Sequence, residues 1–215
     1  MKREACMLKL RPGALYEIEN AIRDREIDIE RRAEGVGAKN ASVHSVAGYL
    51  YVYAEFEDEN GLRALVAPWE NELLYVADYV ARPGEMKLMY HDIGVVRADK
   101  SLIRRRVFAT HLKPGCAAEY KARHQKLIDA RGDRVSDGPE TDFTIWCARD
   151  EFIFGYCEMV KSYDHEPTEE EKRKTTEWET RQLEIMDWFT DDVDWITGQT
   201  HEKMRTLYVQ KAYRG

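Results

Sequence analysis

The chain has 215 residues, of which 43 % are hydrophobic and 34 % are charged, so it can bury a core beneath a densely polar surface. Its formal net charge of −7 argues against nucleic acid as the main partner, because phosphate binding needs a basic surface. No apolar run of about 18 residues and no signal-like start is present, so we expect a cytoplasmic protein that does not span a membrane.

The first part of the chain predicts the element order β-α-β-β-α-β. Its first strand ends at a Pro12-Gly13 turn, its first helix has apolar residues at helical spacing, and Ala47-Gly48 joins the two middle strands. The expected strands are 6–10, 41–46, 49–56 and 86–91, and the expected helices are 14–33 and 61–80.

The same order is predicted a second time, because Leu10-Arg11-Pro12-Gly13 recurs as Leu112-Lys113-Pro114-Gly115 and the patterns that follow recur with it. The expected strands of this second copy are 108–112, 143–147, 152–159 and 204–211, and its helices are 116–130 and 169–189. A charged segment without periodicity, 93–105, is expected to link residues 1–92 to residues 106–215.

This repeated order is typical of the ferredoxin-like, split βαβ motif, so the fold class is α+β with two tandem domains. The strands 49–56 and 152–159 are apolar at nearly every position, which indicates burial on both faces. We therefore expect the two sheets to pack face to face, as an intrachain dimeric α/β barrel.

Comparison of the two copies indicates that the catalytic residues lie on the helix expected at 116–130. The first copy has the aliphatic residues Ile18 and Ile22 where the second copy has Tyr120 and His124. These two side chains are one helical turn apart, and a buried hydroxyl or imidazole needs a hydrogen-bond partner. We expect a polar site in which His124 is the acid–base catalyst and Tyr120 orients the substrate by a hydrogen bond. We expect the first copy, which lacks both residues, to have no such activity.

The pattern Pro-x-x-x-x-Glu-Tyr-x-x-x-His, at Pro114, Glu119, Tyr120 and His124, resembles that of the L-rhamnose mutarotase family. Glu158 in the third strand and Asp187 in the late helix also fit. The resemblance covers residues 105–211 well and 5–91 in outline. It implies a ferredoxin-like dimer in which the helix histidine donates a proton, which makes His124 the donor and Tyr120 a sugar contact.

Residues that could bind the substrate are aromatic for the most part, since flat rings suit sugars and flat apolar ligands. Phe143 stands where the family has a binding tyrosine, and Asp187 where it has an aspartate, although Asp78 matches Asp187 in the first copy. The full set of expected substrate-binding residues is Phe143, Trp146, Tyr156, Trp178, Asp187 and Trp188.

Three functions remain open from these residues. The first is a cofactor-free isomerase of aldose mutarotase type. The second is another cofactor-free enzyme on the same fold, a cyclase, lyase or oxygenase for an aromatic or polyketide-like substrate. The third is a non-catalytic module that binds a small ligand. A mainly apolar site around His124 favours the second, and a site with several hydroxyl partners favours a sugar.

No metal and no cofactor is expected. Cys6, Cys116, Cys147 and Cys157 lack motif spacing and lie in apolar stretches, which predicts buried thiols, and the histidines show no metal-ligand spacing. The expected partner is a small-molecule substrate. A homodimer stays open, because the tandem copy can take the place of the dimer contact.

Overall fold

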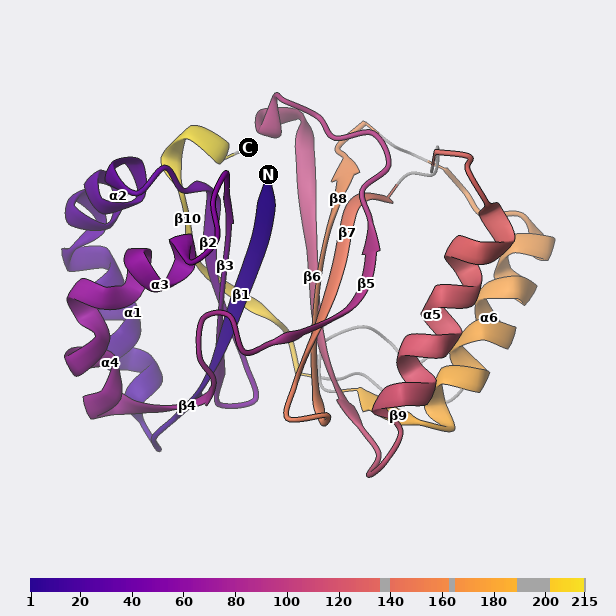
Figure 1. Ribbon diagram of the computed structural model, residues 1–215, viewed down its shortest axis with the longest axis horizontal. Helices are drawn as coiled ribbons and strands as arrows, with labels where there is room; N and C mark the ends of the chain where they lie inside the picture. Colours follow the sequence, from indigo (N-terminus) through magenta and orange to yellow (C-terminus); the bar gives the residue numbers. More distant parts are fainter. Residues whose placement is uncertain (136–139, 163–164, 189–201, 215) are drawn as a thin grey trace. The chain divides into compact units, whose positions relative to one another are not determined.

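Two five-stranded sheets organise the chain, and each carries its helices on one face (Figure 1). The computed structural model describes residues 1–135, 140–162, 165–188 and 202–214. The first unit consists of Met1–Met86 and Met204–Arg214, and the second unit lies within Lys87–Lys203.

In the first unit the sheet order is β10-β2-β3-β1-β4, with antiparallel neighbours. This is the ferredoxin-like order β2-β3-β1-β4 with β10 added beside β2. The strands are β1 (Lys2–Leu10), β2 (Lys39–Val46), β3 (Tyr49–Phe56), β4 (Ala77–Ala81) and β10 (Arg205–Val209). The helices are α1 (Ala14–Asp24), α2 (Glu26–Gly35), α3 (Gly61–Val66) and α4 (Glu70–Val76), with a 3₁₀ turn at Ala67–Trp69.

The second unit repeats this arrangement in the order β5-β7-β8-β6-β9. Its strands are β5 (Lys87–Asp92), β6 (Ile103–Leu112), β7 (Glu140–Ala148), β8 (Phe152–Val160) and β9 (Met186–Trp188). Its helices are α5 (Ala117–Arg131) and α6 (Glu169–Leu183), which lie side by side over one face of the sheet (Figure 1). Gly13 and Gly115, at φ 83° and 80°, make the same turn before the first helix of each unit.

The closing strands differ from the sequence expectation. The helices expected at 61–80 and 169–189 end early, and the short strands β4 and β9 follow them beside β1 and β6. The strands expected to close each copy, 86–91 and 204–211, pair instead within the other unit, as β5 and β10. The expected division into 1–92, 93–105 and 106–215 therefore misplaces both strands. Periodicity within a segment does not reveal which sheet edge that segment will pair with.

Pairing registers also correct the repeat alignment. Tyr90 pairs with Ile145 in β7, and Tyr208 pairs with Val43 at the matching place in β2. A register shift precedes the tyrosine in both β5 and β10. Tyr90 thus corresponds to Tyr208, whereas alignment by sequence alone sets Met86–Tyr90 against Arg205–Val209 and so pairs Tyr90 with Val209.

The expected helix 14–33 is interrupted at Arg25, whose φ of −113° and ψ of 15° leave the helical region and separate α1 from α2. Leu8, Leu50 and Val52 face these helices and form the core of the first unit. Met7, Tyr51 and Tyr53 alternate with them and are also buried, as the unbroken apolar pattern indicates.

The helix-facing core of the second unit is aromatic where that of the first is aliphatic. Phe108 of β6 pairs with Gly155 of β8, and Cys6 pairs with Val52 at the same place in the first unit. The ring of Phe108 covers Gly155 so closely that a Cβ built there would lie 2.1 Å from Phe108 Cζ. Gly155 therefore makes room for the aromatic ring.

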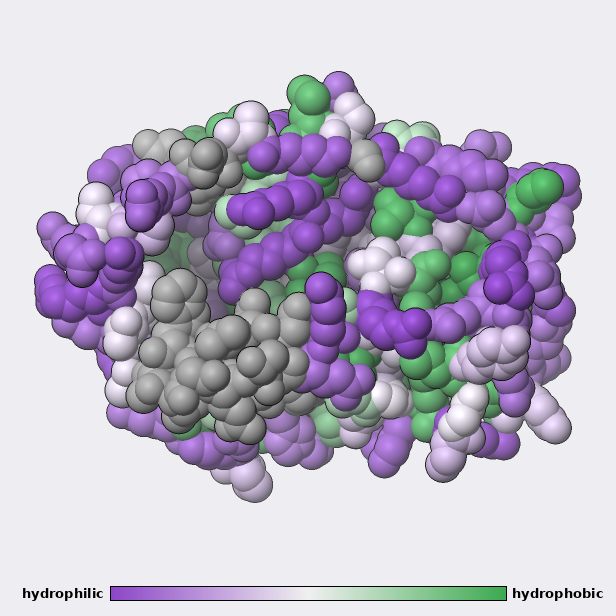
Figure 2. Space-filling view, turned by 180° about the vertical axis from the view of Figure 1, so that it is seen from behind, coloured by the Kyte–Doolittle hydropathy of each residue, from purple (hydrophilic) through white to green (hydrophobic). Residues whose placement is uncertain are grey.

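Figure 2 shows one face of the molecule, on which apolar residues come to the surface between hydrophilic ones. Among the described residues, no helix is both long and apolar enough to cross a membrane.

Substitution of Gly155 by alanine should destabilise the protein by about 1–3 kcal/mol, because the added methyl group overlaps the Phe108 ring. Urea unfolding measures this change. Gly35→Ala is the matched control, since nothing lies within 4 Å of its added Cβ. A second substitution, Phe108→Ala, should reduce the cost of Gly155→Ala. Equal effects of Gly155→Ala with and without Phe108 would contradict the steric explanation.

Candidate functional site

Tyr120 and His124 lie on the sheet-facing side of α5, and only 2 % and 7 % of their surfaces are exposed. Their ring centroids are 4.3 Å apart. The spacing of four residues puts both side chains on one helix face, as the sequence predicts. The centroids of Tyr90 and Trp178 lie 5.3 and 5.4 Å from that of His124. We call Tyr90, Tyr120, His124, Phe143 and Trp178 the His124 cluster.

The hydrogen bonding of His124 fixes its tautomer. Its Nδ1 lies 3.0 Å from the backbone oxygen of Tyr120, and a carbonyl oxygen only accepts, so Nδ1 carries the proton. In the neutral ring Nε2 then holds a lone pair, and it makes no hydrogen bond with any described residue. Burial lowers the pKa of His124, with a smaller opposing effect from the Tyr120 carbonyl. The imidazole is therefore neutral at neutral pH and suited to accept a proton.

The phenol of Tyr120 is the second polar group of the site. Its hydroxyl makes no hydrogen bond within the described part of the chain. Burial raises the pKa of the phenol, so it stays protonated and can donate a hydrogen bond. A base and a donor thus lie one helical turn apart.

Tyr90 comes from β5, the strand that crosses into the second unit from the first half of the sequence. Its hydroxyl donates to Asp92 Oδ2 at 3.1 Å, and Arg131 at the end of α5 forms an ion pair with the same carboxylate. Burial raises the pKa of Tyr90, and the charge of Asp92 adds to the effect. This chain of contacts ties α5 to β5 beside His124.

Trp178 and Phe143 complete the cluster. The Trp178 ring meets His124 edge to face at 86°, and Phe143 meets Tyr90 at 86° with centroids 5.3 Å apart. Arg123, the residue before His124, forms ion pairs with Glu119 and Glu184 and donates to the backbone oxygen of Arg181. Glu119 of the sequence motif is therefore a partner of Arg123, which holds α5 against the end of α6.

Three of the expected substrate-binding residues, Trp146, Tyr156 and Asp187, lie outside the His124 cluster. Trp146 and Tyr156 alternate with core residues that face α5, so they lie on the opposite face of the sheet from His124; Trp146 stacks on Phe154. Strand parity explains this, since Phe143 and Ile145 already occupy the helix face. The Asp187 side chain is exposed, and its residue pairs with His111. The side chain of Trp188 lies outside the described residues.

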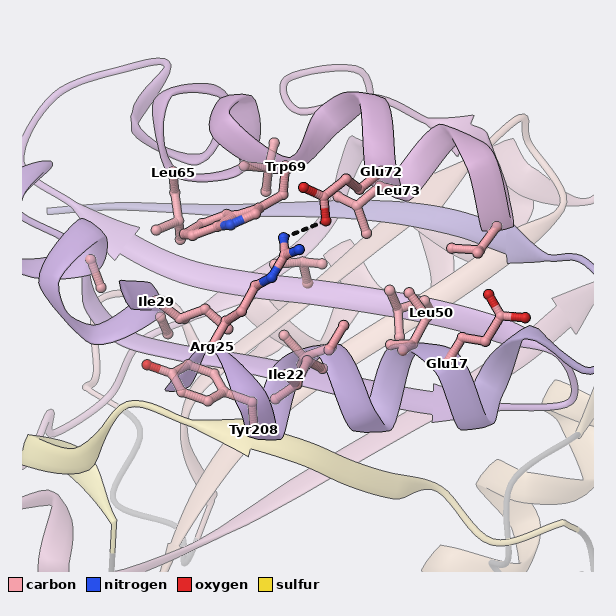
Figure 3. Close-up of a pocket in the computed structure, with 18 of the residues that line it drawn as sticks. Glu17, Ile22, Arg25, Ile29, Leu50, Leu65, Trp69, Glu72, Leu73 and Tyr208 are labelled. Atoms are coloured by element: carbon pink, nitrogen blue, oxygen red, sulfur yellow. Dashed lines mark hydrogen bonds and ion pairs between the residues drawn. The ribbon is translucent and has the colours of Figure 1, made fainter. Parts of the chain in front are cut away.

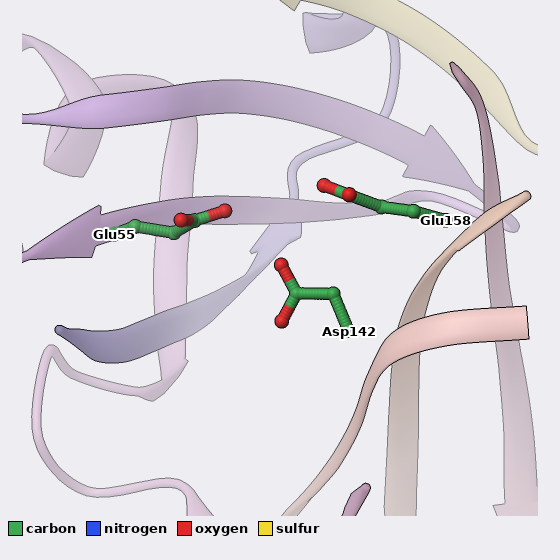
Figure 4. Close-up of side chains that lie close together, drawn as sticks. All are labelled: Glu55, Asp142 and Glu158. Carbon is green, nitrogen blue, oxygen red and sulfur yellow. The ribbon is translucent and has the colours of Figure 1, made fainter. Parts of the chain in front are cut away.

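A second group of polar side chains is buried in the second unit, and Figure 4 draws two of its members, Asp142 and Glu158. Lys100 Nζ lies 2.7 Å from both oxygens of Glu158 and 3.8 Å from Asp142 Oδ2. Tyr156 donates to Glu158 Oε1 at 2.9 Å. The lysine therefore offsets buried negative charge, and Tyr156 acts as a hydrogen-bond donor in this group.

The first unit has a counterpart of this group. Tyr53 donates to Glu55 Oε1 at 3.0 Å, as Tyr156 does to Glu158, and Asn40 Nδ2 donates to the same oxygen at 2.7 Å. Asn40 and Asp142 both have φ of 52° and both lie at a register shift of their strand. Because both copies keep the tyrosine–glutamate pair, a structural role explains Glu158 without reference to a substrate.

Tyr90 is the member of the His124 cluster that sequence reasoning misses. The sequence pattern places its strand in the first copy, because that strand precedes the expected linker. Alignment of the two closing strands by their tyrosines, Tyr90 and Tyr208, would have identified a shared aromatic position. The register of the two sheets reveals it.

Residues 105–209 match the family model described as L-rhamnose mutarotase, which confirms the resemblance seen in the helix motif. A candidate monooxygenase from Fusobacterium nucleatum subsp. nucleatum has a similar structure, with 11 % identity, a TM-score of 0.50 and coverage of 97 % of this chain and 92 % of that chain. A candidate monooxygenase from Lactobacillus acidophilus NCFM has 9 % identity, a TM-score of 0.44 and coverage of 98 % and 95 %. At these identities the structural likeness concerns the fold alone. No curated protein matches.

The lowered pKa of His124 makes stability depend on pH. The unfolded chain binds a proton at this histidine more readily than the folded chain, so lowering the pH from about 7.5 to about 5 favours unfolding. In His124→Phe this contribution is absent, and the free energy of unfolding should fall less over the same range. Urea titrations of both proteins at the two pH values test this. Equal losses in the two proteins would show that His124 is not buried in its neutral form.

Proposed function

We propose that the second unit, which contains most of the residues 105–209 that match the L-rhamnose mutarotase model, is an isomerase that interconverts the anomers of a small sugar. The observation that carries this proposal is the pair of groups on α5. The neutral imidazole of His124 presents an unpartnered Nε2, and the phenol of Tyr120 presents an unpartnered hydroxyl one turn away, within the described part of the chain.

Anomer exchange requires one proton to move between two oxygens of the same carbon. His124 Nε2 takes the proton of the anomeric hydroxyl as the bond from C1 to the ring oxygen breaks, which leaves an open-chain aldehyde. The imidazolium then gives that proton to the former ring oxygen. Closure on the other face of the aldehyde reverses both transfers, so no proton is gained or lost.

The other members of the His124 cluster have binding roles in this scheme. Tyr120 donates a hydrogen bond to the ring oxygen, and its raised pKa keeps the phenol protonated while it does so. Trp178 offers a flat face to the sugar ring. The bond from Nδ1 to the Tyr120 carbonyl keeps Nε2 directed at the substrate in every cycle.

A second candidate follows from the surroundings of His124. Three aromatic rings have centroids within 5.4 Å of the imidazole centroid, and the Tyr90 hydroxyl is already bound to Asp92. Such a site also suits an aromatic or polyketide-like substrate of a cofactor-free cyclase, lyase or oxygenase. In that case His124 Nε2 removes an acidic proton from the substrate.

Substitution of His124 by alanine should lower the anomer exchange rate by roughly 10²–10⁴-fold, because the proton shuttle is lost. Tyr120→Phe keeps the ring and should cost about 3–10-fold, the value of one hydrogen bond. Exchange NMR with a panel of aldoses, L-rhamnose and L-fucose included, measures these rates. His165→Ala is the control, since His165 is an exposed histidine outside the cluster. If the wild-type protein accelerates no aldose, the second candidate replaces the first.

The pH profile of the exchange rate tests the protonation state of His124. As a base, the imidazole works in its neutral form, so activity should rise with pH and level off. Because burial lowers its pKa, the midpoint should lie below the ordinary histidine value of about 6.5. A profile that falls as pH rises through this range would mean that the protonated imidazole is the active form.

A further inference from the structure

The first unit contains an apolar cavity of about 510 Å³ between its helices and its sheet (Figure 3). This volume lies within the range of roughly 300–1,000 Å³ that small-molecule sites occupy. Strands β2 and β3 form the floor, and the walls come from α1 and α2 on one side and from α3 and α4 on the other. The apolar lining includes Ile22, Ile29, Leu50, Leu65 and Leu73, with the rings of Trp69 and Tyr208 at its edges.

One residue that lines the cavity, Ala41, has a small side chain where the second copy has the Phe143 ring. Ile22 corresponds to His124 and Ala41 to Phe143, and the pair Cys6 and Val52 corresponds to Phe108 and Gly155. In the second unit the space above the sheet is filled by the Phe108 and Phe143 rings, whose centroids are 6.0 Å apart. The same backbone therefore encloses a packed aromatic core in one unit and a hollow in the other.

Charge is confined to the rim. Arg25, in the break between α1 and α2, reaches across the opening and forms an ion pair with Glu72 of α4 (Figure 3). Glu17 adds a second carboxylate to the rim. Two acidic groups against one basic group disfavour an anionic ligand. A sugar would leave its hydroxyls unpaired against the aliphatic walls, at a cost for each buried group.

We propose that this cavity is a binding site for a neutral, apolar small molecule with a flat ring system, held between Trp69 and Tyr208. Such a ligand buries apolar surface without losing hydrogen bonds to water. Tyr208 stays in place because its hydroxyl donates to Glu30 at 2.8 Å. The Arg25–Glu72 ion pair closes over the ligand and opens to admit it. This site is separate from the His124 cluster and independent of the proposed isomerase activity.

Fluorescence titration of the full chain with Nile red, a neutral flat apolar dye, tests the proposal. We expect saturable binding with one site per chain. Ile22→Phe places a ring in the cavity from α1, and Leu73→Trp does so from α4, so each should weaken binding about tenfold or more. Circular dichroism and thermal melts identify which of the two variants is folded, and either one suffices.

Two matched variants locate the dye. Ile27→Phe adds the same ring at an exposed position of α2 outside this cavity and should leave the dissociation constant unchanged. His124→Ala should also leave it unchanged, whatever its effect on sugar exchange. Unsaturable binding, undiminished affinity in a folded cavity variant, or loss of binding in His124→Ala would each overturn the proposal.

Discussion

Each sheet depends on a strand that the other half of the chain supplies. A sheet edge presents unpaired backbone N–H and C=O groups, and these need partners wherever water is excluded. Strand β10 provides them for β2, and β5 provides them for β7. Both exchanged strands carry a tyrosine at the same register position, Tyr90 in one sheet and Tyr208 in the other. The pairing that completes each sheet therefore also places an aromatic ring beside the helices.

On this shared framework the two units differ in what fills the space between helices and sheet. In the second unit Gly155 has no side chain, which leaves room for the Phe108 ring. The rings of Tyr90, Tyr120 and Trp178 surround His124. In the first unit Ala41 stands where the second unit has Phe143, and a cavity lies between the helices and the sheet. The two units thus differ in the space that they leave between helices and sheet. The second unit keeps a buried imidazole among aromatic rings. The first unit has space for a ligand between its helices and its sheet.

The sequence is sufficient for local features and for the placement of Tyr120 and His124 on one helix face. Pro-Gly turns, apolar periodicity and the contrast of Ile22 with His124 predicted most elements and the two groups on α5. It was insufficient for pairing, because strand partners depend on backbone hydrogen bonds between distant segments. The ends of the late helices, the exchange of β5 and β10 and the role of Tyr90 were missed for this reason. Trp146 and Tyr156 were misplaced because a one-residue difference in a strand reverses the face.

The exchanged strands also impose an order on synthesis. The sheet of the first unit needs β10, whose residues 205–209 leave the ribosome only after the segments that build the second unit, 87–188, have been made. Until then the outer edge of β2 has no strand partner. Its partner β10 lies about 160 residues further along the chain, and such a separation slows folding. The second unit is contiguous and can assemble first. A nascent first unit is therefore the stage at which this chain is open to pairing with a neighbouring copy.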